Sequence, residues 1–165
     1  MKKILQLKFI LPLAALGLVL AYYLVLPAFI VVEKDEAIMF EPIASSEAQE
    51  TSQANSQELE SNLPEILSQN DFQKAAYDVK GQALLMQQGQ QRIIRFENFE
   101  TINGPSLNIY LVNSQNKDVF FDLGPIKATK GNVNYQIPDD LDLSQYDQVQ
   151  VYCVPFKKVF SYANL

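Results

Sequence analysis

Residues 132–137 read NVNYQI, and every second side chain in this stretch is apolar. Val133, Tyr135 and Ile137 therefore share one face of an extended strand, while the amide side chains share the other face. The same alternation recurs in residues 107–112 (LNIYLV) and in residues 148–153 (QVQVYC). Each of these segments predicts a short strand that buries one face and exposes the other.

Turn signals divide the rest of residues 72–165 into further short strands. Residues 82–88 and 91–97 flank Gly89 and predict a hairpin. Residues 103–105 (NGP) predict a turn, and residues 119–122 and 157–163 predict two more strands. Seven or eight short strands without a long amphipathic helix are typical of an all-β fold, and we expect a compact antiparallel β-sandwich over residues 72–165.

The N-terminal part of the chain has the composition of a membrane anchor. Residues 9–32 contain no charged or amide side chain, and a helix of that length is long enough to cross a bilayer. Lys2, Lys3 and Lys8 precede the run, so the positive-inside rule predicts a cytoplasmic tail over residues 1–8. The prediction is a single-pass protein of the cytoplasmic (plasma) membrane with its C-terminal domain outside. A cleaved signal peptide ending near Ala21 is the alternative, but the apolar run continues for eleven residues beyond it.

An acidic segment separates the predicted anchor from the predicted sandwich. Residues 33–71 carry ten acidic side chains against Lys34, and residues 41–62 are rich in Ser, Gln, Ala and Glu. Such a composition buries too little apolar surface to offset the entropy of ordering the chain. We therefore expect residues 33–71 to be a flexible linker that holds the domain clear of the lipid headgroups, with one helical turn at residues 63–67 as its only regular element.

Composition excludes several classes of chemistry. The chain has no His and one Cys, which removes Ser-His-Asp triads, His-ligated zinc and internal disulfides. The net charge of −6 argues against nucleic acid as a partner. These exclusions remove the common catalytic groups, so we expect no turnover enzyme and no metal site.

Cys153 is the main candidate for a reactive group. It shares the predicted inner face of its strand with Val149 and Val151, which favours a buried thiol that packs as a small apolar side chain. Lys157 and Lys158 follow closely and are candidates to stabilise a thiolate. Both interpretations stay open on the sequence: a redox thiol, or a core residue.

Other candidate sites have weaker signals. Asp140, Asp142 and Ser144 begin like a calcium-binding loop, but Gln145 stands where Gly is needed, so an ordinary Asp-rich turn is the better interpretation. Glu97 and Glu100 could form a carboxylate pair, but nothing in the sequence sets their separation, so exposed strand-end charges are the better interpretation. For a haem, Cys153, Met86 and the tyrosines are the conceivable ligands of the domain.

Four runs of the globular part form a recognisable series: residues 96–111 (FENFETINGPSLNIYL), 122–127 (DLGPIK), 131–135 (GNVNY) and 149–153 (VQVYC). In these runs and their order, the globular part resembles the DM-thirteen domain family. Tyr152 stands where the family usually has Trp, and a His often seen near the first strand is missing around Tyr77.

The resemblance implies an extracytoplasmic role in redox or electron transfer. The family's characteristic cysteine, thought to act as a bare thiol or as a ligand to a prosthetic group such as haem, corresponds to Cys153. The missing His favours the thiol over the haem, and the redox or protein partner is left open. The alternative function is a non-catalytic binding or adhesion module in which Cys153 packs the core.

Overall fold

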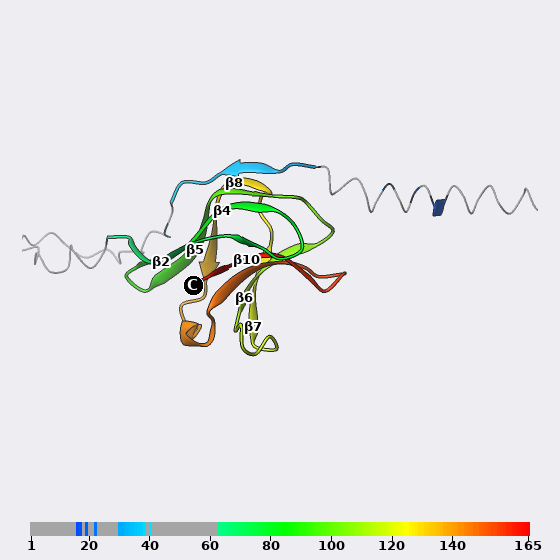
Figure 1. Cartoon of the computed structure of the whole chain (residues 1–165). Helices are drawn as coiled ribbons and strands as arrows, with labels where there is room; N and C mark the ends of the chain where they lie inside the picture. The colour runs from blue at the N-terminus through cyan, green and yellow to red at the C-terminus, as the bar shows by residue number, and fades with distance from the viewer. Residues whose placement is uncertain (1–15, 18, 20–21, 23–29, 39, 41–62) are drawn as a thin grey trace, which may run out of the picture.

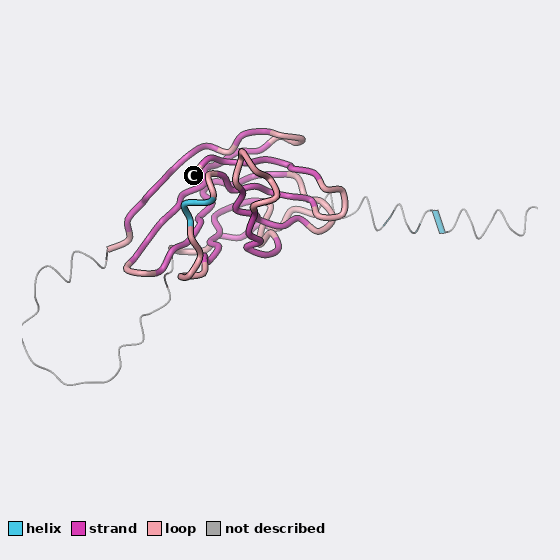
Figure 2. The backbone as a smooth tube through the Cα atoms, turned by 90° about the horizontal axis from the view of Figure 1, so that it is seen from below, coloured by secondary structure: helices cyan, strands magenta, loops and turns pink. Residues whose placement is uncertain are grey.

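The computed structural model describes residues 16–17, 19, 22, 30–38, 40 and 63–165. Residues 63–165 and the segment around residues 33–35 form two five-stranded sheets that pack face to face (Figure 1). Figure 2 shows strands filling the domain, with a helical turn, Leu143–Gln145, near the C-terminus. The prediction of an all-β fold is confirmed.

The first sheet has the strand order β1-β8-β5-β4-β2. Its strands are β1 (Glu33–Asp35), β8 (Lys130–Ile137), β5 (Gln91–Thr101), β4 (Val79–Gln88) and β2 (Glu65–Asp71). β4 and β5 form the hairpin predicted around Gly89, which adopts a positive φ of 58° in the turn. β1 pairs with β8 in parallel, whereas the other neighbours are antiparallel.

The second sheet has the strand order β3-β10-β9-β6-β7. Its strands are β3 (Gln73–Lys74), β10 (Lys158–Asn164), β9 (Gln148–Cys153), β6 (Leu107–Val112) and β7 (Phe120–Pro125). The chain crosses from the first sheet to the second at Phe72, which is buried and packs edge-on against Phe96 with ring centroids 4.8 Å apart.

The core lies between the two sheets and contains the side chains that the alternation predicts. The apolar residues of β6, β8 and β9 at alternate positions are all buried there: Leu107, Ile109, Leu111, Val133, Tyr135, Ile137, Val149, Val151 and Cys153. A smaller cluster on the outer face of the first sheet joins Leu84, Met86 and Ile93, and Phe40 packs over it.

The structure contains strands that the sequence analysis did not predict. Residues 72–165 contain eight strands, β3 to β10, as predicted, but the predicted linker adds two more. The sequence predicts a helical turn at residues 63–67. Residues 65–71 form β2 instead, because the backbone of this segment pairs with β4 over its whole length. Residues 33–35, also assigned to the linker, form β1 at the opposite edge of the first sheet.

A set of polar contacts, which we call the β1 clamp, holds the segment after β1 on the first sheet. Arg95 donates from Nη1 to the Glu36 carbonyl and to Asn134 Oδ1, each at 2.9 Å. Asn134 donates from its backbone N–H to the Glu36 carboxylate and from Nδ2 to the Ala37 carbonyl. Because Arg95 and Asn134 are buried, these contacts also satisfy polar groups that would otherwise be costly to bury.

The route of the chain changes the interpretation of the acidic segment. β1 follows the predicted anchor directly, and β1 and β2 lie at opposite edges of the same sheet. Residues 41–62 therefore connect two strands of the sandwich and do not separate the anchor from it. The predicted transmembrane segment, residues 9–32, falls largely outside the described residues, among which no helix is long and apolar enough to cross a membrane.

Candidate functional site

Cys153 is the last residue of β9, and its side chain is fully enclosed, with 0 % exposure. It lies in the core cluster together with Val149 and Val151, as the alternation predicts. Its Sγ lies 3.2 Å from the Pro105 carbonyl oxygen, to which the thiol donates. The thiol is therefore a hydrogen-bond donor within the core and has no surface open to solvent.

Two connecting segments cover the sulfur at this end of the sandwich. The β5–β6 loop supplies the Pro105 carbonyl, and the Ser106 carbonyl next to it accepts the Val154 N–H at 3.1 Å. Val154 begins the β9–β10 turn, in which Lys157 has a positive φ of 48°. Lys157 and Lys158 are both exposed, whereas the sulfur is enclosed. The two lysines are therefore on the solvent side of the layer that buries the thiol.

An aromatic strip lies on the outer face of the second sheet, beside the Cys153 backbone. It consists of Phe120 of β7, Tyr110 of β6 and Tyr152 of β9. The Tyr110 ring stacks between the other two, with both centroid distances at 5.0 Å and both interplanar angles at 23°. Burial raises the pKa of Tyr110, and the nearby Asp122 carboxylate raises it further. Tyr110 is therefore a neutral phenol at physiological pH.

A groove of about 660 Å³ runs along this strip. Besides the three rings, its lining includes Val159, Lys117 and Lys157. Stacked rings with one side open to solvent offer a large apolar contact area and polar hydroxyl groups, the combination that is enriched at protein interfaces. The groove is thus a candidate contact surface.

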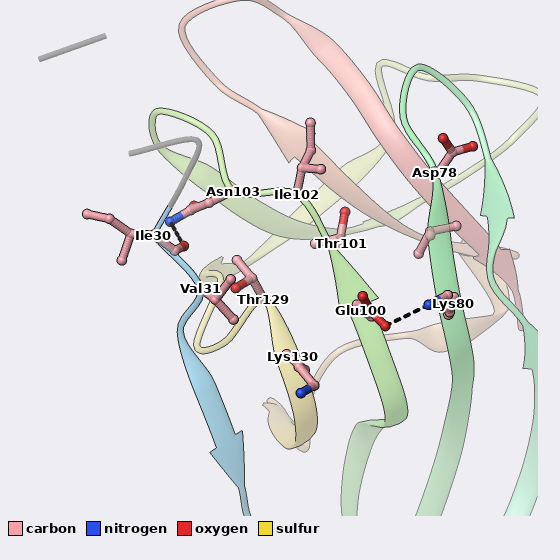
Figure 3. Close-up of a pocket in the computed structure, with 11 residues that line it drawn as sticks. Ile30, Val31, Asp78, Lys80, Glu100, Thr101, Ile102, Asn103, Thr129 and Lys130 are labelled. Atoms are coloured by element: carbon pink, nitrogen blue, oxygen red, sulfur yellow. Dashed lines mark hydrogen bonds and ion pairs between the residues drawn. The ribbon is translucent and has the colours of Figure 1, made fainter. Parts of the chain in front are cut away.

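A second cavity, of about 510 Å³, lies at the end of the sandwich where the N-terminal segment meets the domain (Figure 3). In Figure 3, Asn103 points to Ile30 and donates to its carbonyl oxygen at 3.1 Å. Lys80 reaches across to Glu100 at 2.9 Å. The hydrogen bond from Lys80 lowers the pKa of Glu100, which argues against Glu100 as a proton donor.

The two carboxylates considered as a pair have separate cationic partners. Glu97 accepts from Arg95 Nε at 2.7 Å, whereas Glu100 is paired with Lys80. An acid–base pair needs one carboxyl group with a raised pKa, and the pKa of Glu100 is lowered. The strand-end interpretation therefore explains both residues.

The Asp-rich stretch forms a turn. Asp142 accepts hydrogen bonds from the backbone N–H and the hydroxyl of Ser144 and so caps the Leu143–Gln145 turn. These bonds lower the pKa of Asp142. Among the described residues, no group of three Cys, Asp or Glu side chains is arranged to hold a metal ion.

The residues considered for haem do not fit that group. Met86 lies in the outer cluster of the first sheet, and Cys153 lies between the sheets, so the two side chains do not face a common site. The Cys153 sulfur also has no open face for an iron atom, because its side chain is fully enclosed and hydrogen-bonded to Pro105. Met86 and Cys153 therefore do not form a haem site.

Sequence reasoning missed two of these features. The aromatic strip had a signal, because Tyr110 and Tyr152 both fall on the polar faces of their predicted strands, where an aromatic ring must lie outside the core. The β1 clamp had none, because Glu36 and Arg95 are 59 positions apart and meet only through the edge pairing of β1.

Comparison with known proteins gives one result. The sequence model of the family described as "Electron transfer DM13" matches residues 71–165, which comprise β3 to β10 and the end of β2. Neither a curated protein nor a solved structure matches the chain.

Proposed function

Because the chain belongs to the electron transfer DM13 family, we propose that its sandwich is a non-enzymatic module of an extracytoplasmic electron-transfer system. In this proposal a single N-terminal helix over residues 9–32 displays the module on the outer side of the cytoplasmic membrane. The lysines before the apolar run and the absence of charge within it support this orientation. The match of the family to nearly the whole second sheet and most of the first supports the assignment to the sandwich itself.

The geometry favours a binding role, with Cys153 as a core residue. The observation that carries this conclusion is the enclosed sulfur, with 0 % exposure and a hydrogen bond to the Pro105 carbonyl. A thiol that exchanges electrons with a partner needs contact with that partner, and this one is covered by two connecting segments. In our proposal the aromatic strip provides the contact surface for the redox partner instead, because its stacked rings line a groove on the outer face of the second sheet.

Direct redox chemistry by Cys153 is the second candidate function. One observation favours it: the residue lies immediately before the exposed β9–β10 turn, and its hydrogen-bond acceptor belongs to a loop rather than to a strand. Local opening of these two segments would expose the sulfur without unfolding the sheets. The two candidates therefore differ in how the thiol reacts in the folded protein.

The experiment measures the alkylation of Cys153 in the full chain held in detergent micelles. If Cys153 is a core residue, iodoacetamide reacts only with unfolded molecules. The alkylation rate then rises with urea in proportion to the unfolded fraction. A thiol that is modified in the folded protein as fast as a free cysteine would contradict the core role and support the redox candidate. The Cys153→Ala variant is the companion measurement, and we expect it to lose about 1 kcal/mol of stability and nothing else.

A further inference from the structure

Exposed apolar side chains gather at one end of the sandwich, which we call the end face. Its loops are the β3–β4, β5–β6 and β9–β10 connections. Tyr77 of the β3–β4 connection donates its N–H to the Phe160 carbonyl of β10, and Val154 of the β9–β10 turn donates its N–H to the Ser106 carbonyl of the β5–β6 loop. Phe156 is 64 % exposed at the tip of the β9–β10 turn, and Ile102 is 43 % exposed on the β5–β6 loop. The other exposed apolar members are Ile30, Val31, Tyr77 and Val154.

The predicted membrane anchor ends at this same face. Val32, the last residue of the apolar run, donates its N–H to Thr129 Oγ1 at 2.9 Å and accepts the Thr129 N–H at 2.8 Å. Two residues earlier, Ile30 accepts from Asn103 at 3.1 Å (Figure 3). Because two residues span at most about 7 Å, no spacer separates the end of the run from the loops of the end face.

The charges of the end face suit an anionic surface. Its acidic side chains are already paired with lysines: Asp78 with Lys74, Glu100 with Lys80 and Glu33 with Lys130. Lys157 and Lys158, beside Phe156, have no ion-pair partner among the described residues. Apolar tips next to free lysines are the combination that binds the interface of an anionic bilayer.

We propose that the end face lies on an anionic phospholipid bilayer, with the side chains of Phe156 and Ile102 in the interfacial region. This inference rests on the anchoring part of the proposed function, since it places the end of the anchor at the same face. The sandwich is then held against the membrane in one orientation. The Phe120 end of the aromatic strip, at the opposite end of β6 from the end face, remains accessible to a partner.

The chain contains no Trp, so a single introduced Trp reports on its position without background. The test compares full-length Phe156→Trp with Phe120→Trp in vesicles of phosphatidylcholine and phosphatidylglycerol whose acyl chains carry bromine near the headgroups. Phe120 is a matched control, because it is 50 % exposed and pairs with Val112, at the opposite end of β6 from the end face. We expect bromine to quench Phe156→Trp at least about twofold more than Phe120→Trp and to shift its emission to shorter wavelength.

The outcomes separate this inference from the proposals on which it rests. Flotation of the chain with the vesicles but equal quenching at both positions would overturn the end-face contact and leave the anchor intact. Failure to float would overturn both the anchor and the contact. A blue shift of Phe156→Trp that follows protein concentration and is insensitive to bromine would mean that a second copy covers the end face, which also overturns the bilayer contact. None of these results depends on the role of Cys153.

Discussion

At the scale of single residues, Gly131 determines how closely β1 can approach the sandwich. It pairs with Lys34 in the parallel ladder and has a φ of +111°. A Cβ atom at this position would lie 2.0 Å from the Lys34 carbonyl oxygen, far inside van der Waals contact. Glycine is therefore required both for the backbone conformation and for the space that β1 occupies.

The Gly131→Ala variant should lose β1 pairing, and Gly124→Ala is its matched control. Gly124 has a similar φ of +100°, but a Cβ there meets nothing within 4 Å. Both variants incur the conformational strain of a positive φ, roughly 1–2 kcal/mol, while only Gly131→Ala also clashes with β1. We expect urea unfolding to show a loss about 1–2 kcal/mol larger for Gly131→Ala, with faster amide exchange in β1. Equal losses would mean that β1 contributes nothing to the stability of the sheet.

At the scale of elements, β1 depends on contacts outside its own three residues. Its three residues are exposed, and its ladder is continued by the β1 clamp, in which the Glu36 carboxylate accepts hydrogen bonds from Lys34 and from the Asn134 backbone. Burial alone would raise the pKa of Glu36, but these two hydrogen bonds and the charges of Lys127 and Lys34 together outweigh it, and the net effect is a lowered pKa. A carboxyl group whose pKa is lowered by folding stabilises the folded state above its unfolded pKa and loses that effect as the pH falls through the folded value.

Acid should therefore detach β1 before the sandwich unfolds. As the pH falls below the ordinary Glu value of 4.5, protonation of Glu36 weakens the clamp, and the amide signal of Asn134 should shift while those of the core strands do not. Glu36→Gln should remove this pH dependence. Glu33→Gln is the control, because Glu33 forms an exposed, 3.4 Å ion pair with Lys130 and should leave the titration unchanged. If the Asn134 amide signal still shifts with pH in Glu36→Gln, another titrating group causes the effect.

The elements that the sequence predicts are those with a face in the core. β6, β8 and β9 alternate because one face of each is buried, and that alternation also placed Cys153 on the inner face. β1 and β2 lie at sheet edges and expose nearly all their side chains, so hydrophobic periodicity leaves no trace in them. The hydrogen bond of the Cys153 thiol was equally unpredictable, because its acceptor Pro105 lies 48 positions away and meets it only through the pairing of β6 with β9.

At the scale of the whole molecule, residues 41–62 connect the edge strand β1 to the opposite edge strand β2. The predicted anchor is covalently continuous with β1 alone, and β1 joins the rest of the sandwich through backbone pairing and the β1 clamp. A strand supplied to a sheet edge by a separate chain binds through the same main-chain hydrogen bonds. The sandwich should thus tolerate an interruption of residues 41–62.

Cleavage within residues 41–62 tests this arrangement. With a protease recognition site inserted there, the fragment that begins near residue 63 should co-purify with the N-terminal fragment in detergent micelles after complete cleavage, because β1 still pairs with β8 and no bilayer holds the end face. The two fragments should separate when Gly131→Ala is present, since β1 then fits poorly. Uncut Gly131→Ala is the control and should stay in the micelles. Immediate separation of the cut protein that carries Gly131 would show that the edge pairing is too weak to hold the domain.

In the proposed membrane-anchored form, the sandwich is attached in two ways: covalently through residues 41–62, and reversibly through the pairing of β1 with β8. A surface protease acting on residues 41–62 would convert a permanent attachment into one with a finite lifetime. Shedding would then follow the dissociation rate of one short strand, which acidification would accelerate through Glu36.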